Sequence, residues 1–215
     1  MIRFRPVKPC DAAALVEIYR PYVEIKTASR EYDTPSVDEF TRRIATISAE
    51  FPYIVCELDG RIIGYAYAHR YKERFGYRFC AELTIYLAGD CTKQGIGRRL
   101  YSALIELLGL MGYKNLYGIV TDPNPGSFAL HRSLGFTETG REHLAGVKFG
   151  KWLDVVLFER QLGDYNELSD ERVCPRTVGE LGADVYDSIL LKWSDSSQDK
   201  KSAKRREIKN DGSLQ

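Results

Sequence analysis

The chain has 215 residues and a net charge of +1, with 44% hydrophobic and 28% charged residues. These values are typical of a soluble domain with one buried core, and the near-neutral charge predicts no nucleic-acid partner. Five cysteines without a CxxC pair favour free thiols, and three histidines without metal-ligand spacing predict no metal site. The first residues lack a secretory leader, and no apolar run is long enough to span a membrane. We therefore expect a cytoplasmic protein with no membrane partner.

The first half of the chain predicts four strands and two helices. Alternating or β-branched residues indicate strands at residues 2–6, 53–58, 61–69 and 77–87. Asp11 is expected to cap a first helix that ends before a loop containing Pro21, and Ser36 is expected to cap a second helix. Asp59 and Gly60 join two of the strands as a two-residue hairpin turn.

The second half predicts two further helices and three strands. Gly95 begins a helix that runs to about Met111 and ends at Gly112. Asn124 and Pro125 begin the next helix as its cap and first residue. The remaining strands are expected at residues 115–121, 137–144 and 152–160.

Beyond residue 162 the composition changes. An amphipathic helix is expected over about residues 179–193, followed by a basic run at 200–206 that we expect to be solvated and mobile. We therefore divide the chain into a domain at 1–162 and an extension at 163–215. The predicted order of the domain is β-α-α-β-β-β-α-β-α-β-β. It indicates a mixed α/β fold, because it lacks the regular βαβ alternation of a doubly wound sheet.

The glycine loop at residues 92–99 lies between a predicted strand and a predicted helix, and it contains Gly95 and Gly97. It has the chemistry of a phosphate site. A helix start presents unpaired N–H groups and a positive dipole end, and glycines let the backbone approach an anion. Lys93, Arg98 and Arg99 add positive charge there. The alternative is a tight turn that happens to contain two glycines. A P-loop is excluded because no Lys-Ser/Thr follows the glycines, and Leu100 stands where a dinucleotide fingerprint has Gly or Ala.

Several short motifs occur in order between residues 2 and 162. They are Ile18-Tyr19-x-Pro21-Tyr22-Val23, Gly64-Tyr65-Ala66-Tyr67-Ala68, Glu82-x-Thr84-Ile85-Tyr86, Asn124-Pro125-x-Ser127, Leu130-His131-x-x-Leu134-Gly135-Phe136 and Lys148-x-Gly150-x-Trp152-x-Asp154. Together with the glycine loop, they resemble GNAT acetyltransferases of the phosphinothricin acetyltransferase branch. The chain departs from that pattern at Thr92, where the family has Gln or Arg, and at Phe149, where the branch has His. Arg30 and Glu31 replace a Phe-Arg pair.

The resemblance implies a GNAT fold, with a central mixed twisted sheet of about six or seven strands, about four flanking helices and two strands that splay apart at the acetyl-CoA site. It implies acetyl-CoA as co-substrate, a small-molecule amine as acceptor and a homodimer. The residues expected to bind acetyl-CoA are Ile85, Tyr86, Leu87, Thr92, Lys93, Gln94, Gly95, Ile96, Gly97, Arg98, Asn124 and Ser127. Among them, the backbone N–H of Leu87 or Tyr86 would stabilise the thioester oxyanion.

Glu82 is the candidate general base. It lies within an apolar and aromatic strand, where burial would raise its pKa toward the range in which a carboxylate accepts an ammonium proton. The alternative is a structural ion pair with an arginine such as Arg78.

His131 is the second catalytic candidate. It shares a helix face with Asn124 and Ser127, and by resemblance it would protonate, or donate a hydrogen bond to, the leaving thiolate. The alternative is a packing histidine, and Asn124 could equally be a simple helix cap. His69 and His143 are assigned structural roles.

The resemblance assigns five residues to the acceptor: Lys72, Arg74, Tyr77, Lys148 and Trp152. Cations with aromatics suit a small acid that bears an amine, such as an amino acid or an analogue like phosphinothricin or methionine sulfone. The alternative for Lys72 and Arg74 is a solvated loop. Glu31 could face the same pocket, where it would prefer the ammonium group of the substrate.

The sequence therefore predicts an N-acetyltransferase that transfers the acetyl group directly, with Glu82 as general base. Two alternatives stay open. One is a non-catalytic GNAT module that binds CoA as a sensor or interaction protein. The other is a nucleotide-dependent dehydrogenase, for which the nearest acidic ribose contact, Asp122, lies past the following strand.

Overall fold

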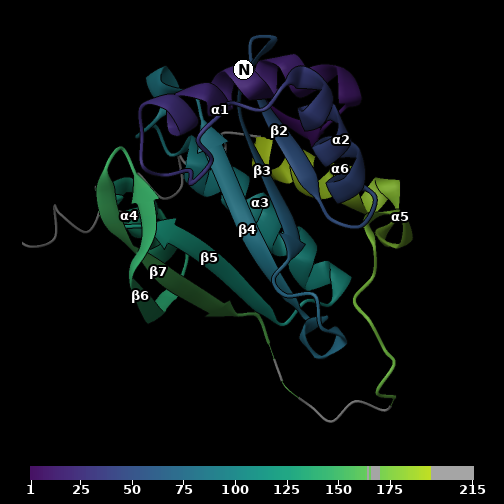
Figure 1. Cartoon of the computed structure of the whole chain (residues 1–215). Helices are drawn as coiled ribbons and strands as arrows, with labels where there is room; N and C mark the ends of the chain where they lie inside the picture. The colour runs from purple at the N-terminus through teal and green to yellow at the C-terminus, as the bar shows by residue number, and fades with distance from the viewer. Residues whose placement is uncertain (164, 166–169, 195–215) are drawn as a thin grey trace, which may run out of the picture.

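The computed structural model describes residues 1–163, 165 and 170–194. Seven strands form one sheet in the order β1-β2-β3-β4-β5-β7-β6 (Figure 1). Their bounds are β1 Ile2–Pro6, β2 Tyr53–Leu58, β3 Arg61–Arg70, β4 Cys80–Leu87, β5 Asn115–Thr121, β6 Thr137–Lys148 and β7 Lys151–Gln161. β4 and β5 are parallel, and the other neighbouring strands are antiparallel. The mixed sheet and the order of elements confirm the predicted fold class.

Helices cover both faces of this sheet. In the described part of the chain they are α1 Ala12–Glu24, α2 Val37–Ser48, α3 Ile96–Met111, α4 Pro125–Ser133, α5 Val178–Leu181 and α6 Ala183–Ser194, with 3₁₀ turns at Pro9–Asp11, Phe75–Tyr77 and Gly89–Cys91. α1 and α2 pack with Tyr53 and Tyr65 on one face. α3 and α6 bury the larger core on the other face (Figure 1). None of these helices is long and apolar enough to span a bilayer.

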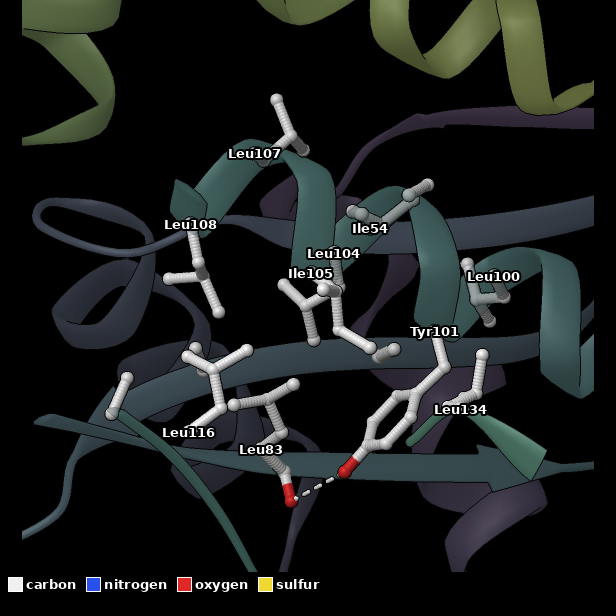
Figure 2. Close-up of a cluster of buried hydrophobic side chains, with 14 of the residues drawn as sticks. Ile54, Leu83, Leu100, Tyr101, Leu104, Ile105, Leu107, Leu108, Leu116 and Leu134 are labelled. Atoms are coloured by element: carbon white, nitrogen blue, oxygen red, sulfur yellow. Dashed lines mark hydrogen bonds between the residues drawn. The ribbon is translucent and has the colours of Figure 1, made fainter. Parts of the chain in front are cut away.

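α3 lies at the centre of the larger core. Leu100, Leu104 and Leu107 follow the spacing of one helix face, and all three are fully buried (Figure 2). Burying a leucine side chain contributes about 1.5–3 kcal/mol. This packing holds α3 against the sheet and fixes its first turn beside the end of β4.

Several local predictions are confirmed. The side chain of Ser36 accepts a hydrogen bond from the N–H of Glu39 and so caps α2. Asp59 and Gly60 both have positive φ, as the two-residue turn between β2 and β3 requires. Gly112 ends α3 with φ of 98°.

The first helix differs from its prediction at both ends. α1 continues through Pro21 to Glu24, because the packing of fully buried Val23 outweighs the hydrogen bond that the proline removes. Asp11 does not cap this helix with its side chain. Its carboxylate instead accepts hydrogen bonds from the Arg5 guanidinium and the Lys8 N–H.

β4 is shorter than predicted, since the 3₁₀ turn at Phe75–Tyr77 takes up its expected start. It pairs with β5 only at residues 80–82, opposite 115–117. Beyond this point β4 still pairs with β3 up to Leu87, and β5 still pairs with β7 up to Thr121. The two parallel strands therefore part directly after Glu82, and Figure 1 shows them diverging. This is the splay that the resemblance implied.

The described part of the extension packs into the domain. Leu181, Tyr186 and Leu190 are buried in the larger core, and α6 contacts α3 and β1. The single predicted helix is two helices, divided at Gly182, whose φ is 89°. The predicted basic run at 200–206 lies outside the described residues. The division at residue 162 stays a prediction.

Candidate active site

Beyond Glu82, the edge of β4 that faces β5 carries backbone N–H and C=O groups with no partner strand among the described residues. The N–H of Ala88 donates to the carbonyl of Ile63 in β3. Because successive backbone groups alternate in direction, Leu83, Ile85 and Leu87 point their N–H and C=O groups toward the gap between β4 and β5. Of the two backbone donors that we predicted, Leu87 therefore faces the gap, whereas the N–H of Tyr86 faces β3.

Two tyrosine hydroxyls occupy the ends of this edge. The hydroxyl of Tyr101 in α3 donates to the carbonyl of Leu83 at 3.0 Å (Figure 2). The hydroxyl of Tyr22 in α1 donates to the carbonyl of Leu87 at 2.6 Å and lies 3.3 Å from the N–H nitrogen of the same residue. The Tyr22 hydroxyl thus accepts from the Leu87 N–H, the group that we predicted to bind the thioester oxygen. Sequence reasoning did not assign either tyrosine to the site.

The first turn of α3 is where we predicted an anion cradle. Gly95 precedes the helix with φ of 78°, and no described side chain caps the first turn, so its N–H groups are open to an anion. A Cβ on Gly97 would lie 3.1 Å from Leu87 Cδ1, so a glycine there lets α3 approach β4 closely. Lys93 and Arg98 are exposed beside this turn.

The other loop side chains contribute differently from the prediction. Thr92 Oγ1 donates to the carbonyl of Gly89, and Gln94 Nε2 donates to the carbonyl of Asp90, so both fold back onto the 3₁₀ turn. Arg99, which we expected to add charge for phosphate, donates to the carbonyls of Trp193 and Ser194 at the end of α6. The backbone N–H groups and the two exposed cations, Lys93 and Arg98, therefore remain as the groups that could bind phosphate, and this contact stays a prediction.

Glu82 lies on the last paired rung of β4, with its side chain 19% exposed. Burial raises the pKa of its carboxyl above the ordinary value, and the charges of His69 and Arg30 oppose that rise. His69 is directly opposite in β3, and its Nε2 lies 3.8 Å from Glu82 Oε1. The suggested partner Arg78 is wrong, because its guanidinium donates to the carbonyls of Glu171 and Val173.

His69 and Arg30 are site residues that sequence reasoning missed. The alternation of Tyr65, Tyr67 and His69 was a signal for one face of β3, but its register with β4 depends on the intervening link. Arg30 reaches across the gap, where its Nη1 lies 3.5 Å from Thr121 Oγ1 at the end of β5. The charge of Arg30 also acts on the buried carboxyl of Glu82.

His131 is a buried, tightly packed residue, with 3% of its surface exposed. Its Nδ1–H donates to the carbonyl of Ser127 at 2.8 Å, so its Nε2 carries no proton. This nitrogen lies 3.3 Å from the Tyr101 hydroxyl, whose one proton is donated to the Leu83 carbonyl. Burial lowers the pKa of the imidazole. Phe158 stacks on the ring with centroids 5.1 Å apart. This geometry favours the packing alternative.

Asn124 caps α4, since its Oδ1 accepts a hydrogen bond from the N–H of Ser127 at 3.2 Å. The cap places both residues in the turn that directly follows β5. Their contact with acetyl-CoA stays a prediction.

The five predicted acceptor residues do not form one cluster. Lys72 lies over the rings of Tyr71 and Tyr77 near the start of β4, and Arg74 precedes the 3₁₀ turn there. Lys148 and Trp152 instead flank the β6–β7 turn, at the end of the sheet where β5 finishes. The seven residues of β5 separate the two groups by about 20 Å.

Lys148 has a structural role that the prediction did not include. It is 1% exposed, and its Nζ donates to the carbonyls of Ser29 and Glu31. Burial lowers the pKa of this amine. Lys148 therefore holds the loop between α1 and α2, while Trp152 is 66% exposed. Among the described residues, no group of three or more His, Cys, Asp or Glu side chains could hold a metal ion.

Comparison with known families decides the class of this site. The family model described as an acetyltransferase (GNAT) domain matches residues 4–157. The chain belongs to the GNAT acetyltransferase family. As a GNAT acetyltransferase it uses acetyl-CoA as co-substrate, which confirms the predicted family, fold and enzyme class.

Similar proteins act on small amines. A phosphinothricin N-acetyltransferase of Alcaligenes faecalis is 39% identical over 74% of this chain and 81% of its own length. An L-methionine sulfoximine/L-methionine sulfone acetyltransferase of Salmonella typhimurium is 33% identical over 72% of this chain and 91% of its own length. A phosphinothricin acetyltransferase of Sinorhizobium meliloti, solved in complex with acetyl-CoA, is 36% identical, covers 75% of this chain and 89% of its own, and superposes with a TM-score of 0.73.

Proposed function

We propose that this GNAT acetyltransferase transfers the acetyl group of acetyl-CoA directly to the α-amino group of an amino acid or an amino-acid analogue. The observation that carries the proposal is the position of Glu82, a buried carboxyl on the last rung before β4 and β5 part. The relatives that act on phosphinothricin and on methionine sulfoximine support this class of acceptor.

Glu82 accepts a proton from the ammonium group of the acceptor, directly or through one water. Burial favours this role, because the raised pKa of Glu82 makes it a stronger base than an exposed glutamate. The free amine then forms a bond to the acetyl carbon, and the carbon–sulfur bond breaks. The electron pair leaves with the CoA sulfur as a thiolate, and the second proton of the attacking nitrogen is lost as the amide forms and protonates that thiolate, which gives the CoA thiol.

The developing oxyanion is stabilised by the Leu87 N–H, which faces the gap. The thioester oxygen takes the place of the Tyr22 hydroxyl as acceptor of this N–H, and the hydroxyl becomes a second donor when its proton turns from the Leu87 carbonyl to the oxyanion. We assign His131 no proton transfer, because its Nδ1–H is held by the Ser127 carbonyl and its Nε2 carries no proton toward Tyr101.

Arg30 is suited to the acceptor carboxylate. In an α-amino acid the ammonium and carboxylate groups are neighbours, and Glu82 and Arg30, whose charges interact, offer one opposite charge to each. Lys72 lies over the ring of Tyr71, which stacks on Tyr117 opposite Glu82, so it stays a second candidate cation for the acceptor.

Release of the CoA thiol tests the proposal, with acetyl-CoA and a panel of amino acids, methionine sulfone, methionine sulfoximine, phosphinothricin and polyamines. Glu82→Gln should lower kcat by about 10²–10⁴-fold and leave acetyl-CoA affinity nearly unchanged. Glu57→Gln is a matched control, because Glu57 is similarly buried at 17% exposure but pairs with Arg5 away from the gap. Equal loss of turnover and affinity in Glu82→Gln would reject the general base. Acetyl-CoA binding without thiol release for any amine would favour the non-catalytic module.

We also propose a cytoplasmic homodimer, as the family resemblance implies. Light scattering during size-exclusion chromatography tests the assembly, and a mass near one chain would reject it. Localisation of a tagged chain tests the compartment.

A further inference from the structure

A cavity of about 80 Å³ lies between the sheet and the α1–α2 layer. Five tyrosines line it: Tyr19, Tyr53, Tyr65, Tyr67 and Tyr86. Tyr65 is opposite Tyr86, Tyr67 is opposite Thr84, and His69 is opposite Glu82 on the following rung of the same face. Same-face rungs are about 7 Å apart, so the cavity begins about one such step from Glu82.

Two buried polar atoms at this cavity have no hydrogen-bond partner among the described residues. In the described part of the chain, the buried side-chain oxygens without a hydrogen-bond partner are Glu31 Oε2 and the Tyr65 hydroxyl. Both residues line the cavity, and Tyr65 is completely buried. Buried polar groups in folded proteins are almost always hydrogen-bonded. Two incomplete groups at one cavity therefore indicate a polar occupant that completes them.

The charge around the cavity restricts that occupant. Arg43 donates to Glu31 Oε1 at 2.7 Å and to Glu39 Oε1 at 3.1 Å, and Arg42 pairs with Glu39 Oε2 at 2.6 Å, so two guanidiniums balance the two carboxylates. An anionic group without a donor would still place its charge against the unpartnered Glu31 Oε2. Glu31 Oε2 can only accept a hydrogen bond, so the occupant must offer an N–H or O–H group, whereas the Tyr65 hydroxyl can donate or accept.

We propose that this cavity binds the end of the acceptor side chain and selects a neutral group that carries a hydrogen-bond donor, such as a carboxamide, a hydroxyl or a sulfoximine. The inference rests on the proposed function, because it takes the acceptor amine to lie at Glu82. Water completes Glu31 and Tyr65 in the absence of acceptor, and the donor-bearing group replaces it on binding. An acceptor that cannot donate leaves Glu31 Oε2 unpaired.

L-Methionine sulfoximine and L-methionine sulfone form a matched pair, because they differ by an N–H group in place of one oxygen. We expect kcat/KM to favour the sulfoximine by about tenfold or more, with phosphinothricin also poor because its ionised phosphinate carries no hydrogen-bond donor for Glu31 Oε2. Calorimetry with CoA-loaded protein should give the same order of affinities. In Glu31→Gln the amide can donate to the sulfone, so the preference should disappear or reverse. Glu39→Gln keeps a carboxylate at the cavity and should retain the preference.

Tyr65→Phe gives an independent readout. It should lower kcat/KM for the sulfoximine while leaving turnover of L-norleucine, which has an apolar side chain, nearly unchanged. Its Tm should not fall, because the hydroxyl has no protein partner to lose. Equal use of both analogues by the unaltered enzyme, binding of neither, or the same ratio in Glu31→Gln and Glu39→Gln would each overturn the inference. Absence of thiol release with every amine would instead overturn the proposed function.

Discussion

Gly118→Ala tests whether His131 is clamped in place or free to act at the thioester. Gly118 lies in β5, directly beneath the His131 ring. A Cβ added there would lie 2.7 Å from His131 Cδ2 and 3.2 Å from Cε1, well inside van der Waals contact. The ring has no space to retreat, because Phe158 stacks on it and Phe136 and Tyr101 meet it edge-on.

The magnitude follows from two contributions. Overpacking a well-filled core costs about 1–3 kcal/mol. Displacing the ring also weakens the 2.8 Å hydrogen bond from His131 Nδ1–H to the Ser127 carbonyl, a further ~0.5–1.5 kcal/mol. We therefore expect Gly118→Ala to lower the free energy of unfolding by about 2–4 kcal/mol. For a chain of this size that corresponds to a Tm lower by about 4–16 °C.

Urea and thermal unfolding measure this loss. Gly140→Ala is the matched control, since Gly140 also lies in a strand but has open space around its Cβ position. His131→Ala in the Gly118→Ala background should recover part of the stability, because the two sites are in direct contact. If Gly118→Ala unfolds like Gly140→Ala and gains nothing from the second substitution, the ring is mobile. The packing argument against a direct catalytic role for His131 would then be refuted.

The remaining predictions concern the pH profile, the α1–α2 loop and the extension. His69→Gln removes a positive charge that lowers the pKa of Glu82. The acidic limb of the kcat/KM pH profile, where Glu82 must be ionised, should therefore move to higher pH. A limb that does not move would show that His69 does not act on the pKa of Glu82. Lys148→Met leaves two backbone carbonyls without their donor and should cost about 2–3 kcal/mol in urea unfolding, with faster proteolysis of the loop at 25–35; a fully stable variant would contradict this role. Arg99→Gln should lower stability by about 1–2 kcal/mol, because its charge no longer caps the carbonyl end of α6. Acetyl-CoA affinity that fell in proportion would show that Arg99 also holds phosphate.

Local chemistry made parts of the fold predictable. The Ser36 cap, the Asp59–Gly60 turn and the Asn124 cap each depend on residues within about four positions along the chain, so the sequence contains all the groups that act. The short motifs predicted the family, and the apolar residues around Glu82 in its strand predicted that its side chain is buried. These features were set by neighbours in sequence.

The site was decided by contacts between distant segments. His69 meets Glu82 only through the β3–β4 register, and Tyr65 and Glu31 share a cavity only because α1 and α2 pack on that face. Lys148 holds the α1–α2 loop, because folding brings the carbonyls of Ser29 and Glu31 to its amine. Composition and spacing determined which groups this protein possesses. The tertiary structure decided which of them meet, because partners far apart in sequence are selected by strand register and by packing of the core.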